Sequence, residues 1–164
     1  MDDIEPFWIT EAGQIAQAVG VAARALRDDP DWTAISDDPL VRLEMLSSMF
    51  AGSLGEARVA GVPSGEASDA DRLLHFRSIL AAHDLDEPHW HVGPVGVEPG
   101  FQSMGMGGAA MRLLCEEFDE HGRVSWVKTA KRENLRFYGG LGFEVVDESP
   151  MLSAHLWFMR RQPH

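Results

Sequence analysis

The chain of 164 residues is long enough for one domain spanning residues 1–164, and its content of 45% hydrophobic and 24% charged residues is typical of a globular protein. Its 26 acidic residues outnumber its 14 lysines and arginines, and the net charge of −12 argues against nucleic acid as a partner, because phosphate contacts require clustered cations. The single cysteine, Cys115, excludes an internal disulfide, and the lack of a long apolar run argues against a membrane partner.

The first part of the chain predicts one strand followed by two helices. Residues 1–5 are acidic and lack the hydrophobic core of a signal peptide, so we expect a cytoplasmic protein. Residues 4–9 predict a short strand, residues 10–27 a helix and residues 38–50 a second helix. The apolar positions at helical spacing are Ile15, Ala18, Val19, Ala22 and Leu26 in the first helix, and Leu43, Leu46 and Phe50 in the second.

A cluster of aspartates separates these two helices. Its members are Asp28, Asp29, Asp31, Asp37 and Asp38. Carboxylates at this density could recruit an amine, and the net charge of the chain would suit a cationic substrate, although solubility explains that charge equally well. The interpretation we favour for the cluster is a set of solvated caps and turns.

The middle of the chain, from residue 54 to about residue 80, predicts one short strand and one further helix. Residues 58–62 are the only strand-like run between residues 54 and 66, and the Pro63-Ser64-Gly65 sequence closes it. A third helix begins near Ser68 and places Leu73, Phe76 and Leu80 on one apolar face.

Residues 89–97 predict the central strand of a sheet. Pro94 cannot donate a ladder hydrogen bond, so we expect a bulge at Gly93 and Pro94. Residues 123–128 predict the neighbouring strand, and the helix between the two makes the pair parallel. The remaining elements are a helix over residues 134–139 and a closing antiparallel pair over residues 143–146 and 154–160.

A glycine-rich loop joins the central strand to the helix that we expect over residues 109–120. Gly105, Gly107 and Gly108 have no Cβ, so the backbone can take unusual conformations and approach a ligand closely. Unpaired N–H groups and the helix dipole favour a phosphate or pyrophosphate at this point, although an ordinary turn is the alternative. The sequence has neither the Lys-Ser or Lys-Thr of a P-loop nor the G-x-G-x-x-G spacing of a dinucleotide fold here.

A second motif follows in residues 134–143, where Asn precedes Phe-Tyr and then Gly-Phe. Together the two motifs resemble the GNAT superfamily of acyl-CoA-dependent N-acetyltransferases, whose pyrophosphate loop reads Gln or Arg, two residues, Gly, one residue, and Gly or Ala. The matching residues are Gln102, Gly105 and Gly107 in the loop, and Asn134, Phe137, Tyr138, Gly142 and Phe143 in the second motif.

This resemblance implies the α/β (α+β) GNAT fold, in which helices flank a central, mixed, mostly antiparallel twisted sheet with one splayed parallel strand pair. The family normally has a hairpin where this chain has residues 54–66, so here the N-terminal hairpin is very short or one strand is missing. In the family, the helices over residues 10–27 and 38–50 border the acceptor pocket, and the third helix lies over one side of the site.

The resemblance also implies acetyl-CoA as cosubstrate, with no metal. Val95 and Val97 would pair with the pantetheine arm through their backbone, and Asn134 would position the cosubstrate or a water. The cofactor-binding residues that it implies are Val95, Val97, Gln102, Ser103, Met104, Gly105, Met106, Gly107, Gly108 and Asn134. Three cations, Lys131, Arg132 and Arg136, could meet the coenzyme A phosphates.

Two residues are implied as catalytic. Tyr138, the only tyrosine, matches the family residue that stabilises the departing thiolate, and a packed aromatic is the alternative. Of the candidate bases His89, His91, Glu98 and Glu133, we favour His91 because it lies on the splayed strand, although a structural histidine is the alternative. Members of the family often have an acidic residue near the position of Lys128. Because this chain has a lysine there, the resemblance does not imply a carboxylate base at that position.

The function that the resemblance implies is direct transfer of an acetyl group from acetyl-CoA to an amine acceptor, which is a small molecule or a peptide N-terminus. We also allow for a homodimer. The first alternative is a non-catalytic acyl-CoA-binding or sensing module of the same fold. The second is an unrelated nucleotide-binding protein.

Overall fold

The computed structural model describes residues 11–54 and 67–164 of the chain. Two predicted strands lie outside the described residues, over residues 4–9 and 58–62. The prediction of a shortened hairpin over residues 54–66 falls almost wholly outside them as well. Within the described part, no helix has the length and apolar character that crossing a bilayer requires.

The described residues form one mixed sheet of four strands in the order β1-β2-β4-β3. The first pair is parallel, and the other two pairs are antiparallel. This arrangement, with helices on both faces, confirms the predicted fold class. The strands are β1 (His89–His91), β2 (Val124–Thr129), β3 (Glu144–Met151) and β4 (Ala154–Arg161).

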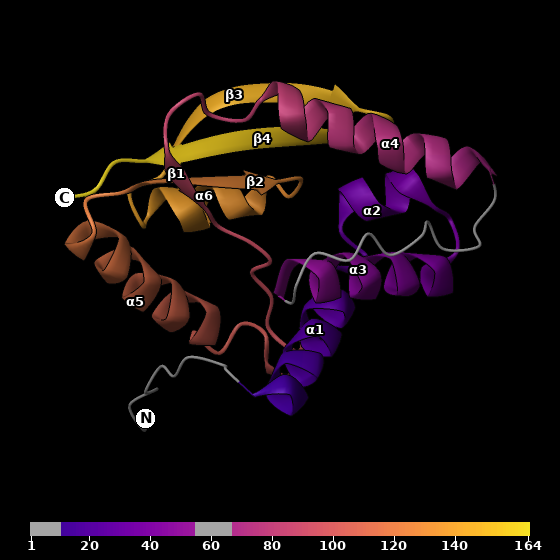
Figure 1. Cartoon of the computed structure of the whole chain (residues 1–164), viewed down its shortest axis with the longest axis horizontal. Coiled ribbons are helices and arrows are strands. Elements are labelled where there is room, and N and C mark those ends of the chain that lie inside the picture. The colour runs from indigo at the N-terminus through magenta and orange to yellow at the C-terminus, as the bar shows by residue number, and fades with distance from the viewer. Residues whose placement is uncertain (1–10, 55–66) are drawn as a thin grey trace.

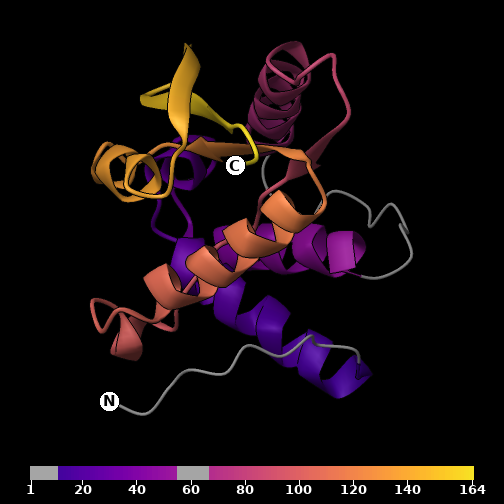
Figure 2. The same ribbon diagram turned by 90° about the vertical axis from the view of Figure 1, so that its left-hand side faces the viewer.

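Six α-helices and one short 3-10 helix surround the described sheet (Figure 1). Figure 2 looks from the end that carries α5, and shows α6 and α4 on opposite sides of the β3–β4 pair. The helices are α1 (Ala12–Leu26), α2 (Pro30–Ile35), α3 (Pro39–Leu54), α4 (Ala67–Ala82), η1 (Pro99–Phe101), α5 (Met106–Glu120) and α6 (Glu133–Gly139). Five of the α-helices agree with the sequence predictions to within a few residues, whereas α2 was not predicted.

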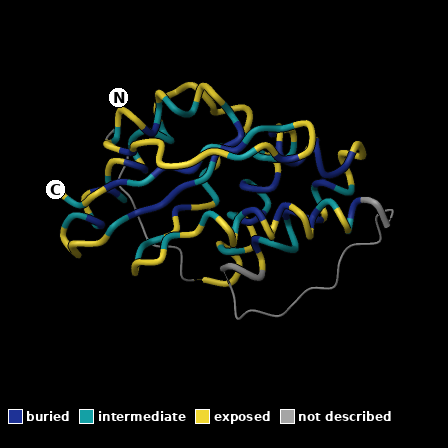
Figure 3. The backbone as a smooth tube through the Cα atoms, turned by 90° about the horizontal axis from the view of Figure 1, so that it is seen from above, coloured by how far each residue is buried: buried dark blue, intermediate teal, exposed yellow. Residues whose placement is uncertain are grey.

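The sheet separates two hydrophobic cores, because successive side chains of a strand point to opposite faces. Trp126 of β2 packs into the core with α1 to α4 and stacks on Phe158 at 5.5 Å, whereas Val127 packs into the core with α5 and α6. Figure 3 shows these buried stretches running through the middle of the molecule. Each fully buried large apolar side chain stabilises the fold by about 1.5–3 kcal/mol.

The central strand is shorter than predicted. Hydrogen bonding to β2 ends where the Val92 N–H donates to the Trp126 carbonyl at 2.8 Å, and the chain then leaves the sheet. Pro94 has no N–H to continue the ladder, and Gly96 packs so closely on α1 that an added Cβ would lie 2.9 Å from the Ala25 Cβ. The predicted bulge is therefore the end of the strand, and the parallel pair opens beyond it.

A charged contact joins the end of the sheet to the end of α5. The buried Arg161 guanidinium of β4 makes two hydrogen bonds of 2.7 Å to the Asp119 carboxylate. Asp119 also accepts a bond from the His164 N–H at 2.9 Å, and these contacts, Arg161 first, lower the pKa of Asp119 to about 2.

This contact should give the protein an acid-sensitive stability. A carboxyl whose pKa is lower in the folded than in the unfolded chain stabilises above its ordinary pKa, and that stabilisation is lost as the pH falls toward the folded pKa. We expect Asp119→Asn to lower the free energy of unfolding by about 1–2 kcal/mol at neutral pH, with the difference disappearing between about pH 4 and pH 2. Urea titrations of both proteins across that range would measure it, and a difference independent of pH would contradict this account.

Candidate active site

The loop before α5 presents free backbone N–H groups. Ser103 and Gly105 have φ values of 63° and 86°, and Gly105 precedes the first helical residue without a side-chain cap. The first helical hydrogen bond runs from the Ala109 N–H to the Gly105 carbonyl at 3.0 Å. Among the described residues, the N–H groups of Met106, Gly107 and Gly108 have no partner. Such a helix start is a binding site for an anion.

Two of the three glycines act differently from the prediction. The helix begins at Met106 and not at residue 109, so Gly107 and Gly108 are helical and only Gly105 has a left-handed conformation. Gly107 instead permits close packing, because an added Cβ would lie 3.3 Å from the Val97 side chain. Gly105 therefore permits the tight turn before α5, and Gly107 permits α5 to pack closely against Val97.

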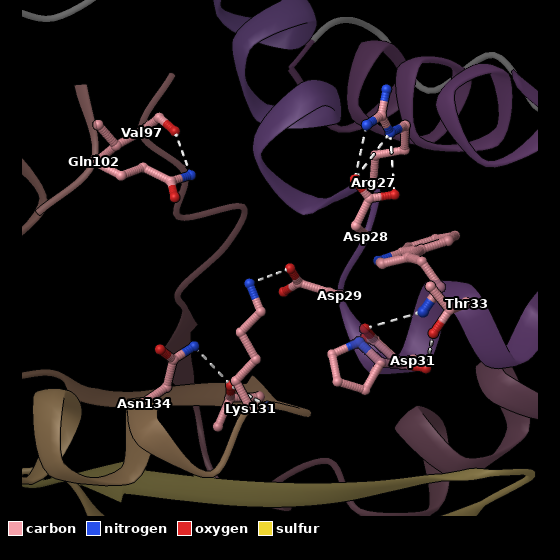
Figure 4. Close-up of polar contacts among 12 residues, drawn as sticks. Arg27, Asp28, Asp29, Asp31, Thr33, Val97, Gln102, Lys131 and Asn134 are labelled. Carbon is pink, nitrogen blue, oxygen red and sulfur yellow. Dashed lines mark hydrogen bonds and ion pairs between the residues drawn. The ribbon is translucent and has the colours of Figure 1, made fainter. Parts of the chain in front are cut away.

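A cavity of about 630 Å³ adjoins this helix start. It brings together four of the predicted cofactor-binding residues, namely Val95, Val97, Met106 and Gly107. Gln102 lies beside it, where its side-chain amide donates to the Val97 carbonyl at 3.0 Å (Figure 4). Met104 is exposed on the loop.

A second cavity of about 740 Å³ shares Val95 and Gly96 with the first. It extends along β1 to His91 on one side and along α1 to Gln14 and Gln17 on the other. The segment that leaves the sheet after Val92 therefore forms a common wall of both cavities.

Tyr138 and Asn134 lie one helical turn apart on α6, and neither lines the two described cavities. The Asn134 amide donates to the Thr129 hydroxyl at 3.0 Å, which fixes it at the end of β2. Tyr138 is buried between the rings of Phe137 and Phe143. Burial, and then the negative charge of Asp29, raise the pKa of Tyr138 to about 12. The phenol thus keeps its proton at neutral pH and can donate it in a hydrogen bond.

The candidate bases differ in how firmly they are held. Arg24 makes three hydrogen bonds of 2.7–3.2 Å to Glu98 and lowers its pKa. His89 lies 3.1 Å from the Asp84 carboxylate and 2.8 Å from the Glu87 carbonyl. His91 is exposed at the end of β1, but one face of its ring stacks on Trp126 at 4.8 Å. Loss of solvent on the stacked face lowers the pKa of His91 below its ordinary value, which favours the neutral imidazole at pH 7.

The aspartates between α1 and α3 are not all solvated, which corrects the interpretation from the sequence. Asp29 and Asp31 are buried, and their carboxylates form ion pairs with Lys131 and Lys128. Lys131 thus meets Asp29, at 2.5 Å, and no phosphate is needed to explain its position (Figure 4). The sequence shows Asp29 close to Asp31, and Lys128 close to Lys131, but about 100 residues separate the two segments. No local pattern in either segment predicts that they form ion pairs with each other.

The lowered pKa of His91 can be tested directly. In an NMR titration, we expect the His91 ring protons to shift with a midpoint below the ordinary value of 6.5, because the charged ring loses solvation against Trp126. The signal can be assigned by its loss in His91→Gln. A midpoint at or above 6.5 would show that the nearby Asp84 charge outweighs burial.

Comparisons with known proteins agree with this geometry. The sequence profile described as "Acetyltransferase (GNAT) family" matches residues 54–143, more than half of the chain. In the described residues, no group of three or more His, Cys, Asp or Glu is placed to hold a metal ion.

Three solved structures are similar in fold, each at 16% sequence identity. One is described as histone acetyltransferase HPA2 and related acetyltransferase from Corynebacterium glutamicum, with a TM-score of 0.65 over 96% of this chain and 95% of that one. The polyamine N-acetyltransferase of Drosophila melanogaster gives 0.62 over 93% and 97%. An agmatine N-acetyltransferase mutant gives 0.61 over 93% and 96%.

Proposed function

The chain belongs to the GNAT acetyltransferase family, and from this premise we propose that it transfers an acetyl group from acetyl-CoA directly to an amine. The observation that carries the proposal is the cluster of unpartnered N–H groups of Met106, Gly107 and Gly108, beside a cavity lined by Val95 and Val97. Together they offer an anion site and, next to it, an apolar wall with free backbone groups.

Two groups of described residues would bind two parts of coenzyme A, the pyrophosphate and the pantetheine arm. The N–H groups at the start of α5 would bind the pyrophosphate, because they carry the positive end of the helix dipole. The backbone of Val95, which has no hydrogen-bond partner among the described residues, would pair with the amides of the pantetheine arm. Gln102 holds the Val97 carbonyl and so keeps this segment in place.

Tyr138 would act at the sulfur atom. In the proposed reaction the amine nitrogen attacks the thioester carbonyl, the carbon–sulfur bond breaks, and the thiolate leaves. A phenol with a pKa near 12 stays protonated and can stabilise that thiolate by a hydrogen bond. His91, neutral at pH 7, would accept the proton that the amine loses.

The hydrogen bond proposed from Tyr138 to the leaving sulfur can be tested by mutation. We expect Tyr138→Phe to lower kcat for acetyl transfer by about 10- to 100-fold while acetyl-CoA binding stays the same, because only the hydrogen bond to the leaving sulfur is removed. Release of coenzyme A thiol should be measured against a panel of amines that includes agmatine and polyamines, on which proteins of similar fold act. Binding of acetyl-CoA without thiol release from any amine would instead favour the non-catalytic binding module.

The anion site at the start of α5 can be tested by adding a charge at Gly107. Gly107→Asp should weaken acetyl-CoA binding at least about tenfold in calorimetry, because a carboxylate would stand among the N–H groups and repel the pyrophosphate. Gly107→Asn is the matched control, since it has nearly the same size without the charge and should lose less. Equal affinity for all three proteins would contradict a pyrophosphate at the start of α5.

A further inference from the structure

Two buried ion pairs join the turn between α1 and α2 to the end of β2. The side chains of Asp29 and Asp31 are 11% and 2% exposed, and those of their partners Lys131 and Lys128 are 32% and 19% exposed. Both aspartates are thus fixed inside the protein, while Lys131 reaches solvent.

The two pairs differ in how far they can open. Asp31 also accepts a hydrogen bond from the Trp32 N–H at 3.1 Å, and the Lys128 ammonium lies 4.9 Å from the centre of the Phe76 ring. By contrast, the Lys131 ammonium has no partner besides Asp29 among the described residues. Lys131 can therefore move into solvent when another cation takes its place at Asp29, whereas Lys128 is held by further contacts.

The Asp29 carboxylate cannot follow Lys131 outward. Its backbone is fixed where α1 ends and α2 begins: its N–H donates to the Leu26 carbonyl, and its carbonyl accepts from Trp32 and Thr33, each at 3.0 Å. If Lys131 left, a buried carboxylate would remain without a cation, and it would attract another.

This carboxylate stands beside the proposed reaction centre. Lys131 belongs to the turn that positions α6, because its carbonyl accepts from the Asn134 N–H at 3.0 Å and its N–H donates to the Thr129 hydroxyl at 3.2 Å. Tyr138 follows one turn later on the same face of α6, and the charge of Asp29 acts on its phenol. Figure 4 shows the Lys131 ammonium reaching from this turn to Asp29.

We propose that the Lys131 ammonium holds the place of a substrate cation, and that an acceptor carrying a primary ammonium displaces Lys131 and pairs with Asp29. The acceptor class is then a diamine, whose bound ammonium anchors it while its second, neutral amine attacks the thioester. This inference rests on the proposed function for its chemistry, but the exchange of cations on Asp29 can be measured without turnover.

The test compares 1,4-diaminobutane with 1-butanol, which has a chain of the same length and no ammonium. In calorimetry with coenzyme A present, we expect Lys131→Gln to bind 1,4-diaminobutane about tenfold more tightly than the natural chain, since no internal cation competes for Asp29. Asp29→Asn should bind it at least about tenfold more weakly, and Asp37→Asn, which removes an exposed carboxylate of the same cluster, should leave it unchanged. Neither Asp29→Asn nor Lys131→Gln should change the binding of 1-butanol, because it has no charge to pair with Asp29.

The same variants separate this inference from the proposed function. Unchanged or weaker binding of 1,4-diaminobutane to Lys131→Gln would contradict the proposed displacement of Lys131. The ion pair of Lys131 and Asp29 would then have only a structural role, joining two segments of the chain. Tighter binding, together with no thiol release from acetyl-CoA with any amine, would instead support the cation site and contradict the transferase. Where turnover is seen, KM for 1,4-diaminobutane should follow the binding changes in Lys131→Gln and Asp29→Asn.

Discussion

Both cavities of the candidate site owe their shape to the departure of the chain from the sheet after Val92. Two constraints cause it: Pro94 cannot donate to the ladder, and Gly96 lies so close to α1 that it leaves no room for a Cβ. The parallel pair opens as a result, and the backbone that leaves it forms a wall shared by two cavities. A strand that stayed paired to its end would cover the groups on which the proposed cosubstrate depends.

Charge pairs fix the elements around this opening. Arg24 of α1 binds Glu98 just after the departing segment, and the ion pairs of Asp29 and Asp31 hold the turn after α1 against the end of β2. Three of the 14 lysines and arginines thus lie in ion pairs at the edges of one site, where the pairs of Asp29 and Asp31 are buried and that of Arg24 is exposed. Because buried pairs of this kind contribute little net stability, the specificity of the site is a reason to keep them.

Much of the fold could be predicted from the sequence, because helical periodicity and the two motifs are local signals. Five of the six described α-helices, the antiparallel closing pair and the family were confirmed. The end of β1, the early start of α5 and the burial of Asp29 were not foreseen, since each depends on contacts between segments far apart in the chain. The roles of the site residues stay predictions: His91 lines the second cavity, whereas Tyr138 and Asn134 share a face of α6 and line neither described cavity.

In the proposed complex, the pyrophosphate of acetyl-CoA would lie on the free N–H groups at the start of α5. An NMR titration of the ¹⁵N-labelled protein with acetyl-CoA would test it most directly, because it follows each backbone N–H separately. We predict that the largest shifts fall on Met106, Gly107 and Gly108, with smaller ones on Val95. Saturable binding that leaves these N–H signals unmoved would place the cosubstrate elsewhere, and the absence of any shift would contradict the account.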